Sequence, residues 1–139
     1  MTVTRILGSA ALALSVSAIA HAGPVRQCVE ESEKLVGRRA ALLDAKEVPR
    51  RLRDVPLEFP TRAGSTKAGS SIWLGDALVD QDGKVRAVFT LRPLRFDPPW
   101  PEFEEAIAAN IRQRVYEPAT LDGQAVPFCL TVSVSINWK

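Results

Sequence analysis

Cys28 and Cys129 are the only cysteines in this chain of 139 residues, and His21 is its only histidine. Two thiols and one imidazole do not supply the four ligands of a structural zinc site, so we expect no metal. An oxidising compartment would favour a Cys28–Cys129 disulfide closing a loop of about 100 residues. Two separate buried thiols are the alternative. The spacing is not Cys-x-x-Cys, which argues against redox chemistry.

The remaining ionisable residues do not indicate catalysis. Glu102, Glu104 and Glu105 lie in the first turn of a predicted helix, where the helix dipole favours anions, and this explains them without an acid–base role. If His21 is removed with a leader peptide, no imidazole base remains for Ser-His-Asp or Cys-His catalysis. We therefore expect a protein that is not an enzyme and that uses no cofactor.

The composition is that of an ordinary globular protein, with 46% hydrophobic and 24% charged residues and a formal net charge of +2. Its length predicts one folded domain. The nearly balanced charge gives no electrostatic reason to expect nucleic-acid binding. The short basic cluster of Arg50, Arg51 and Arg53 has no interleaved aromatic residues on which bases would stack, so a solvated face explains it better.

Residues 1–22 are typical of a secretory signal. Arg5 precedes the apolar run 6–20, and Ala20-His21-Ala22 supplies the small residues needed for cleavage after Ala22. The run is about 15 residues long, whereas spanning a bilayer takes about 20, although an uncleaved anchor is the alternative. We expect an exported protein that is periplasmic or secreted.

The mature chain is predicted to begin with a helix. Apolar residues at helical spacing run from Val25 to about Lys46, and Pro49 is expected to end the helix. Residues 48–71 contain several prolines and a loop of small residues, which predicts irregular structure. We therefore take residues 23–70 as an N-terminal helix followed by a loop that contains proline and glycine.

The second half predicts a hairpin and another helix. Ser71–Val79 and Val85–Leu91 are apolar runs separated by a turn in which Gly83 can adopt a positive φ. Pro101 suits the first turn of a helix, and Pro118 is expected to end it.

The last strand carries the clearest pattern. From Val126 to Trp138 apolar and polar residues alternate, which predicts one buried and one polar face. Cys129 falls on the polar face, so a disulfide would tie the first helix to the outer side or edge of the sheet. The order of elements predicts an α+β fold in which helices pack on a small antiparallel sheet of about three strands. Such a sheet has exposed edges, and we expect the strand from Val126 to Trp138 to form an edge that is a template for an incoming strand.

Two motifs of the second half carry a family resemblance. One is the strand–Asp-x-x-Gly–strand hairpin at Asp80-Gln81-Asp82-Gly83, and the other is the block from Tyr116-Glu117-Pro118-Ala119 through Gly123 to Val126-Pro127. In these motifs residues 72–138 resemble the C-terminal domain of TonB and its relatives. The chain departs from the family at Arg114, where a Trp is common, and in having no long segment rich in Pro, Lys and Glu. We interpret residues 71–139 as such a domain without the spacer.

The resemblance implies a protein-binding module whose sheet edge takes an extended peptide from an outer-membrane receptor or another envelope protein, in connection with transmembrane transport. The side chains expected to select the peptide form the polar row of the last strand: Thr131, Ser133, Ser135 and Asn137. A solvated strand face explains this row equally well. Two other functions stay open: an energy transducer anchored by residues 6–20, and a homodimer that exchanges strands.

Overall fold

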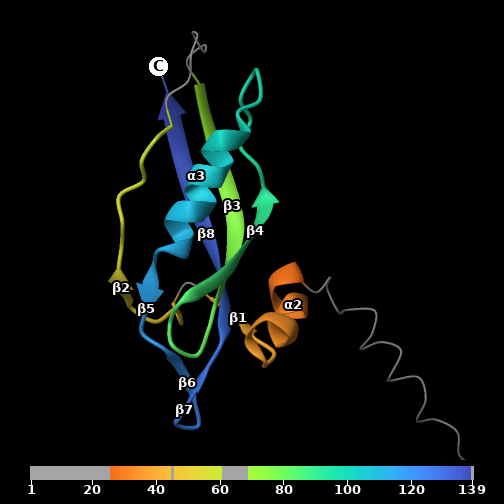
Figure 1. The fold of residues 1–139 in the computed structure, drawn as a ribbon, viewed down its shortest axis with the longest axis vertical. Helices are drawn as coiled ribbons and strands as arrows, with labels where there is room; N and C mark the ends of the chain where they lie inside the picture. Colours follow the sequence, from red (N-terminus) through yellow and green to blue (C-terminus); the bar gives the residue numbers. More distant parts are fainter. Residues whose placement is uncertain (1–25, 45, 61–68, 139) are drawn as a thin grey trace, which may run out of the picture.

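The computed structural model describes residues 26–44, 46–60 and 69–138 (Figure 1). The predicted signal and its cleavage site lie outside the described residues. In the described part of the chain, no helix has the length and apolar character needed to cross a bilayer. The elements are α2 (Gln27–Val36), β1 (Ala41–Leu43), β2 (Arg51–Arg53), β3 (Gly69–Val79), β4 (Val85–Arg92), α3 (Pro101–Arg112), β5 (Val115–Tyr116), β6 (Ala119–Leu121), β7 (Gln124–Val126) and β8 (Phe128–Trp138).

The main sheet has four strands in the order β1-β8-β3-β4. The long strands β3 and β8 pair antiparallel along their full length, and β3 pairs antiparallel with β4. Short β1 joins the other side of β8 in parallel orientation. The protein is therefore α+β. Its main sheet contains one strand more than the roughly three expected from the sequence, and the parallel β1 makes it mixed and not purely antiparallel as predicted.

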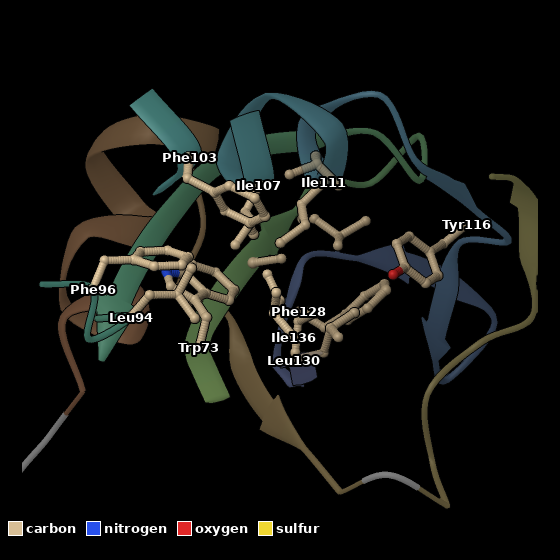
Figure 2. Packing of buried hydrophobic residues seen from close by; sticks show 14 residues of the cluster. Trp73, Leu94, Phe96, Phe103, Ile107, Ile111, Tyr116, Phe128, Leu130 and Ile136 are labelled. Carbon is tan, nitrogen blue, oxygen red and sulfur yellow. The ribbon is translucent and has the colours of Figure 1, made fainter. Parts of the chain in front are cut away.

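Helix α3 covers one face of the sheet (Figures 1 and 2). Phe103, Ile107 and Ile111 of α3 are buried against a sheet face that includes Trp73 and Phe128. Full burial of one such side chain stabilises the fold by about 1.5–3 kcal/mol. Along β8 the apolar residues face this core, and the polar residues that alternate with them lie on the opposite, outer face.

Helix α2 lies against the outer face, where Cys28 and Cys129 are joined by a disulfide with a Cα–Cα distance of 6.2 Å. Both cysteines are fully buried and pack with Leu78 and Ala40 in a second, smaller core. The predicted pairing of the two cysteines and the link between helix and outer face are confirmed. The disulfide agrees with an oxidising compartment.

The first helix is shorter than predicted. It ends at Val36, because Gly37 adopts a left-handed conformation with φ 78° and its N–H donates to the carbonyl of Glu33. The buried hydroxyl of Ser32 then accepts a hydrogen bond from the N–H of Ala40, which turns the chain back onto the sheet. The prediction of helix up to Lys46 is therefore wrong, and residues 41–43 form β1.

The second helix also ends earlier than predicted, at Arg112 rather than near Pro118. The two residues of β5 pair with β2, and the N–H of Tyr116 donates to the carbonyl of Gly83 at 2.8 Å. The hairpin β6–β7 follows, with Asp122 and Gly123 at φ 52° and 81° in its turn. The long strand predicted from Val126 begins only at Phe128.

Candidate peptide-binding edge

The two sides of β8 are covered to very different extents. On one side β3 pairs with every residue from Phe128 to Trp138 in one unbroken register. On the other side β1 pairs only with Phe128–Leu130. Among the described residues, no strand pairs with residues 131–137 on that side. We call this stretch the β8 edge.

The expectation that the whole strand from Val126 forms an edge is wrong for Phe128–Leu130. The sequence pattern assigned residues 41–43 to a helix, whereas they form the strand that covers the start of β8. The remaining stretch is still long enough for several main-chain hydrogen bonds, since adjacent strands bond at about every second residue on each side.

Strand β4 forms the opposite border of the sheet, and it is a poorer template for an incoming strand. Its register with β3 shifts twice, leaving Arg86 and Leu91 as extra residues on β4. Such irregularities twist an edge and interrupt its ladder, which is one way that proteins block unwanted pairing. The β3–β8 register contains no shift, so the β8 edge presents the regular template.

The four predicted side chains share the outer face of β8, and all four residues are exposed. They alternate with inward-facing Val132, Val134 and Ile136, as the period-two pattern predicts. The structure therefore brings Thr131, Ser133, Ser135 and Asn137 together in a row beside the β8 edge. The row places alternate polar groups next to the outward side chains that a guest strand would carry.

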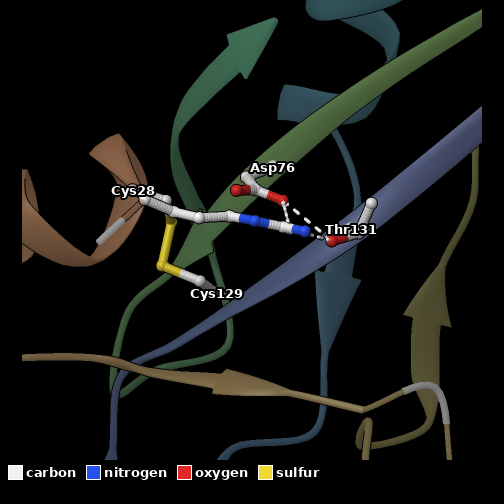
Figure 3. Close-up of polar contacts among 5 residues, drawn as sticks. Cys28, Asp76, Cys129 and Thr131 are labelled. Atoms are coloured by element: carbon white, nitrogen blue, oxygen red, sulfur yellow. Dashed lines mark hydrogen bonds and ion pairs between the residues drawn. A yellow bond between two sulfur atoms is a disulfide. The ribbon is translucent and has the colours of Figure 1, made fainter. Parts of the chain in front are cut away.

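Thr131 differs from the rest of the row because its hydroxyl belongs to a network inside the sheet (Figure 3). The hydroxyl donates to Oδ1 of Asp76 at 2.9 Å and accepts from the guanidinium of Arg26 at 2.8 Å. The same guanidinium lies 3.1 Å from Oδ1 of Asp76. This makes Thr131 a structural link between strands as well as a member of the polar row.

Asp76 is fully buried, and only one of its carboxylate oxygens is used. Oδ1 takes both contacts, whereas Oδ2 has no hydrogen-bond partner among the described residues. A buried carboxylate requires a cationic or hydrogen-bonded partner, because it has lost its hydration. Arg26 provides the charge from a side chain that is 40% exposed. The pair lies at the point where β1 leaves β8.

The disulfide holds this arrangement together, because Arg26 lies two residues before Cys28 and Thr131 lies two residues after Cys129 (Figure 3). The covalent link therefore brings the N-terminal segment to the beginning of the β8 edge. A cavity of about 440 Å³ opens there, and Arg26, Leu42 and Thr131 are among the residues that line it.

Aromatic side chains gather at the far end of the edge, on the inner face. The ring of Phe59 packs at a tilt against that of Phe103 with centroids 5.4 Å apart, and Phe96 packs against Trp138 with centroids 4.6 Å apart. A cavity of about 260 Å³ lies among these rings and Ile136. The β8 edge is thus bounded by an ion pair at its start and by aromatic rings at its end.

The sequence prediction did not identify Arg26, Asp76 or the aromatic cluster. Asp76 carried a usable signal, because it is the one charged residue inside the apolar run 71–79. A charge in a central strand implies a buried partner. The partner itself is 50 residues away in sequence, and only the folded chain identifies it.

The chain matches no protein-family model and no curated protein.

Proposed function

We propose that this protein is a binding module without enzymatic activity, which captures an extended peptide by adding it as a strand to the β8 edge. The observation that carries the proposal is the unequal pairing of β8, whose residues 131–137 are paired with β3 on one side and with no strand on the other among the described residues. Main-chain hydrogen bonds would hold the peptide, and side chains next to Ser133, Ser135 and Asn137 would select it.

We expect binding at the β8 edge to be weak and reversible. Each main-chain hydrogen bond contributes about 1 kcal/mol net, and ordering a flexible peptide costs about 2–5 kcal/mol. About six to eight such bonds along residues 131–137 would leave about 1–6 kcal/mol, so a guest strand would bind with a Kd between about tens of micromolar and many millimolar unless side-chain pockets contribute. Such affinity suits a transient contact in the cell envelope.

The proposed setting is the periplasm or the extracellular space, after removal of the predicted signal. The disulfide and the signal-like segment 1–22 support export. The resemblance of residues 72–138 to the TonB C-terminal domain supports an outer-membrane receptor or another envelope protein as the source of the peptide, and a link to transport across that membrane.

Titration of the ¹⁵N-labelled, disulfide-bonded protein with an extended segment of an outer-membrane receptor tests the proposal. We expect saturable shifts of the amide signals in residues 131–137 and protection of those amides from hydrogen exchange. The controls are two versions of the same peptide, one N-methylated at the odd positions and the other at the even positions. One version lacks the N–H donors that face β8 and should not bind. The other keeps those donors and should bind like the unmethylated peptide.

Shifts confined to β4, or equal binding of both methylated peptides, would contradict strand addition at β8. A homodimer through the same edge gives a different result. In that case the amides of residues 131–137 would already be protected without peptide, and the protection would fall on dilution.

A further inference from the structure

A second polar feature lies on the outer face of the sheet, beyond the part that α2 covers. A cavity of about 370 Å³ opens over the ends of β3 and β8. Its floor is formed by exposed residues of two paired strands, in which Ser70 stands opposite Asn137 and Ile72 opposite Ser135. Arg92 and Arg95 line it as well. We call it the arginine pocket.

The chain positions both arginines by backbone contacts. Arg92 is the last residue of β4 and pairs with Leu74 of β3. Pro93 follows, and the N–H of Arg95 then donates to the hydroxyl of Ser71 at 3.0 Å. These contacts hold the segment after β4 beside β3, where the strand pairing of β4 has ended.

Neither guanidinium has an anionic partner in the described chain. The ion pairs of the structure engage other arginines, such as Arg26 with Asp76 and Arg86 with Asp80. Among the described residues that line the arginine pocket there is no aspartate or glutamate. Two unpaired guanidinium groups next to serine hydroxyls and an asparagine amide are suited to a carboxylate, which guanidinium binds through two parallel hydrogen bonds.

We infer that the arginine pocket binds an acidic side chain of the partner peptide, so that the segment recognised by this protein carries Asp or Glu. The inference rests on the proposed strand addition, because Ser135 and Asn137 belong both to the polar row beside the β8 edge and to the pocket floor. A guest strand would lie about 4.8 Å from β8 and, because β3 stands between β8 and β4, about 14 Å from β4. An outward glutamate would therefore extend over β8, and the long side chain of Arg92 would have to extend over β3 to meet it.

The test compares two capped peptides, Thr-Val-Glu-Val-Glu-Val-Thr and the same sequence with both Glu replaced by Gln. Binding to the disulfide-bonded protein is followed by amide shifts at low ionic strength. We expect the Glu peptide to bind about fivefold more tightly, as befits partly exposed charge pairs. High salt should reduce this ratio, because it screens exposed charges.

Two double variants with the same change in net charge separate the pocket from a general charge effect. In R92Q/R95Q the preference for Glu over Gln should disappear, so that the affinity ratio falls to about one. In R38Q/R39Q, whose arginines are exposed and lie after α2, the ratio should be unchanged. Amide spectra of both variants without peptide verify that they are folded.

The outcomes distinguish this inference from the proposed function. Equal binding of the two peptides to the unmodified protein would overturn the arginine pocket and leave strand addition standing. Binding of neither peptide would contradict strand addition. In that case, titration with glutarate tests carboxylate binding to the arginine pocket independently of strand addition. Shifts of Ser70, Ser135 and Asn137 that are lost in R92Q/R95Q would then support a carboxylate site, and no shift in the millimolar range would overturn it.

Discussion

The guanidinium of Arg26 lies 3.1 Å from Oδ1 of Asp76, a carboxylate that is fully buried in the middle of β3. Thr131, which stands opposite Asp76 in the β3–β8 ladder, bonds to both groups. One polar network therefore links the N-terminal segment to the two long strands at the position where β1 ends and the β8 edge begins.

Replacing Arg26 with Met should destabilise the protein by about 1–2 kcal/mol. Asp76 would lose its cation and keep only the bond from Thr131. Removing one partner of a fully buried pair costs about 3–5 kcal/mol, but Arg26 is 40% exposed, so a smaller effect is expected. Urea denaturation measures the change.

Together with R26M, the variants D76N and R26M/D76N form a double-mutant cycle, which measures the interaction energy between Arg26 and Asp76. The amide introduced by D76N would still accept the hydrogen bond from Thr131, and it would carry no unpaired charge when Arg26 is absent. We expect the double variant to be more stable than the sum of the two single effects predicts, by about 1 kcal/mol. Strictly additive effects would show that the ion pair contributes nothing to stability.

Removing the disulfide in the variant C28S/C129S should lower the free energy of unfolding by about 2–4 kcal/mol. The bond links residues 101 positions apart, so its loss gives the unfolded chain much conformational freedom. The urea midpoint is the measurement, and a reductant should lower the midpoint of the natural protein but not that of the variant. Equal midpoints for the natural protein and the variant would contradict a stabilising role.

The sequence predicted those parts of the fold that depend on local pattern. The alternation of apolar and polar residues in β8 predicted its two faces and the outer position of Cys129. The apolar runs on either side of the turn at Gly83 predicted the β3–β4 hairpin. The pairing of β1 with β8 could not be predicted in this way. It depends on Gly37 ending α2 and on the bond from Ala40 to Ser32, which return an apolar segment to the sheet.

Two glycines at turns allow a matched comparison of backbone strain. Gly83 and Gly123 have φ of 84° and 81°, but a Cβ on Gly83 would overlap the carbonyl oxygen of Tyr116, whereas one on Gly123 would meet nothing within 4 Å. We expect G123A to cost about 1 kcal/mol through its left-handed conformation, and G83A to cost at least about 2 kcal/mol more.

The expected difference arises because the methyl group introduced by G83A would push β5 away and break the hydrogen bond from the N–H of Tyr116 to the carbonyl of residue 83. Urea denaturation of both variants provides the measurement. A similar cost for the two substitutions would mean that β5 moves without resistance and does not support the hairpin.

The candidate site was predicted less completely than the fold. The polar row of Thr131, Ser133, Ser135 and Asn137 follows from period-two spacing and lies where expected. The extent of the edge depends on which segment covers β8, and the arginine pocket depends on where the chain runs after Pro93. Both are long-range relationships with no local sequence signal.

The central claim is that β8 is open beyond Leu130, and hydrogen exchange of its amides in the protein without ligand tests this most directly. Because successive N–H groups of a strand point to opposite edges, alternate amides in residues 131–137 should exchange rapidly, while those bonded to β3 stay protected. In Phe128–Leu130, paired on both sides, every amide should be protected. Protection of every amide from 131 to 137 in a dilute, monomeric sample would contradict the account.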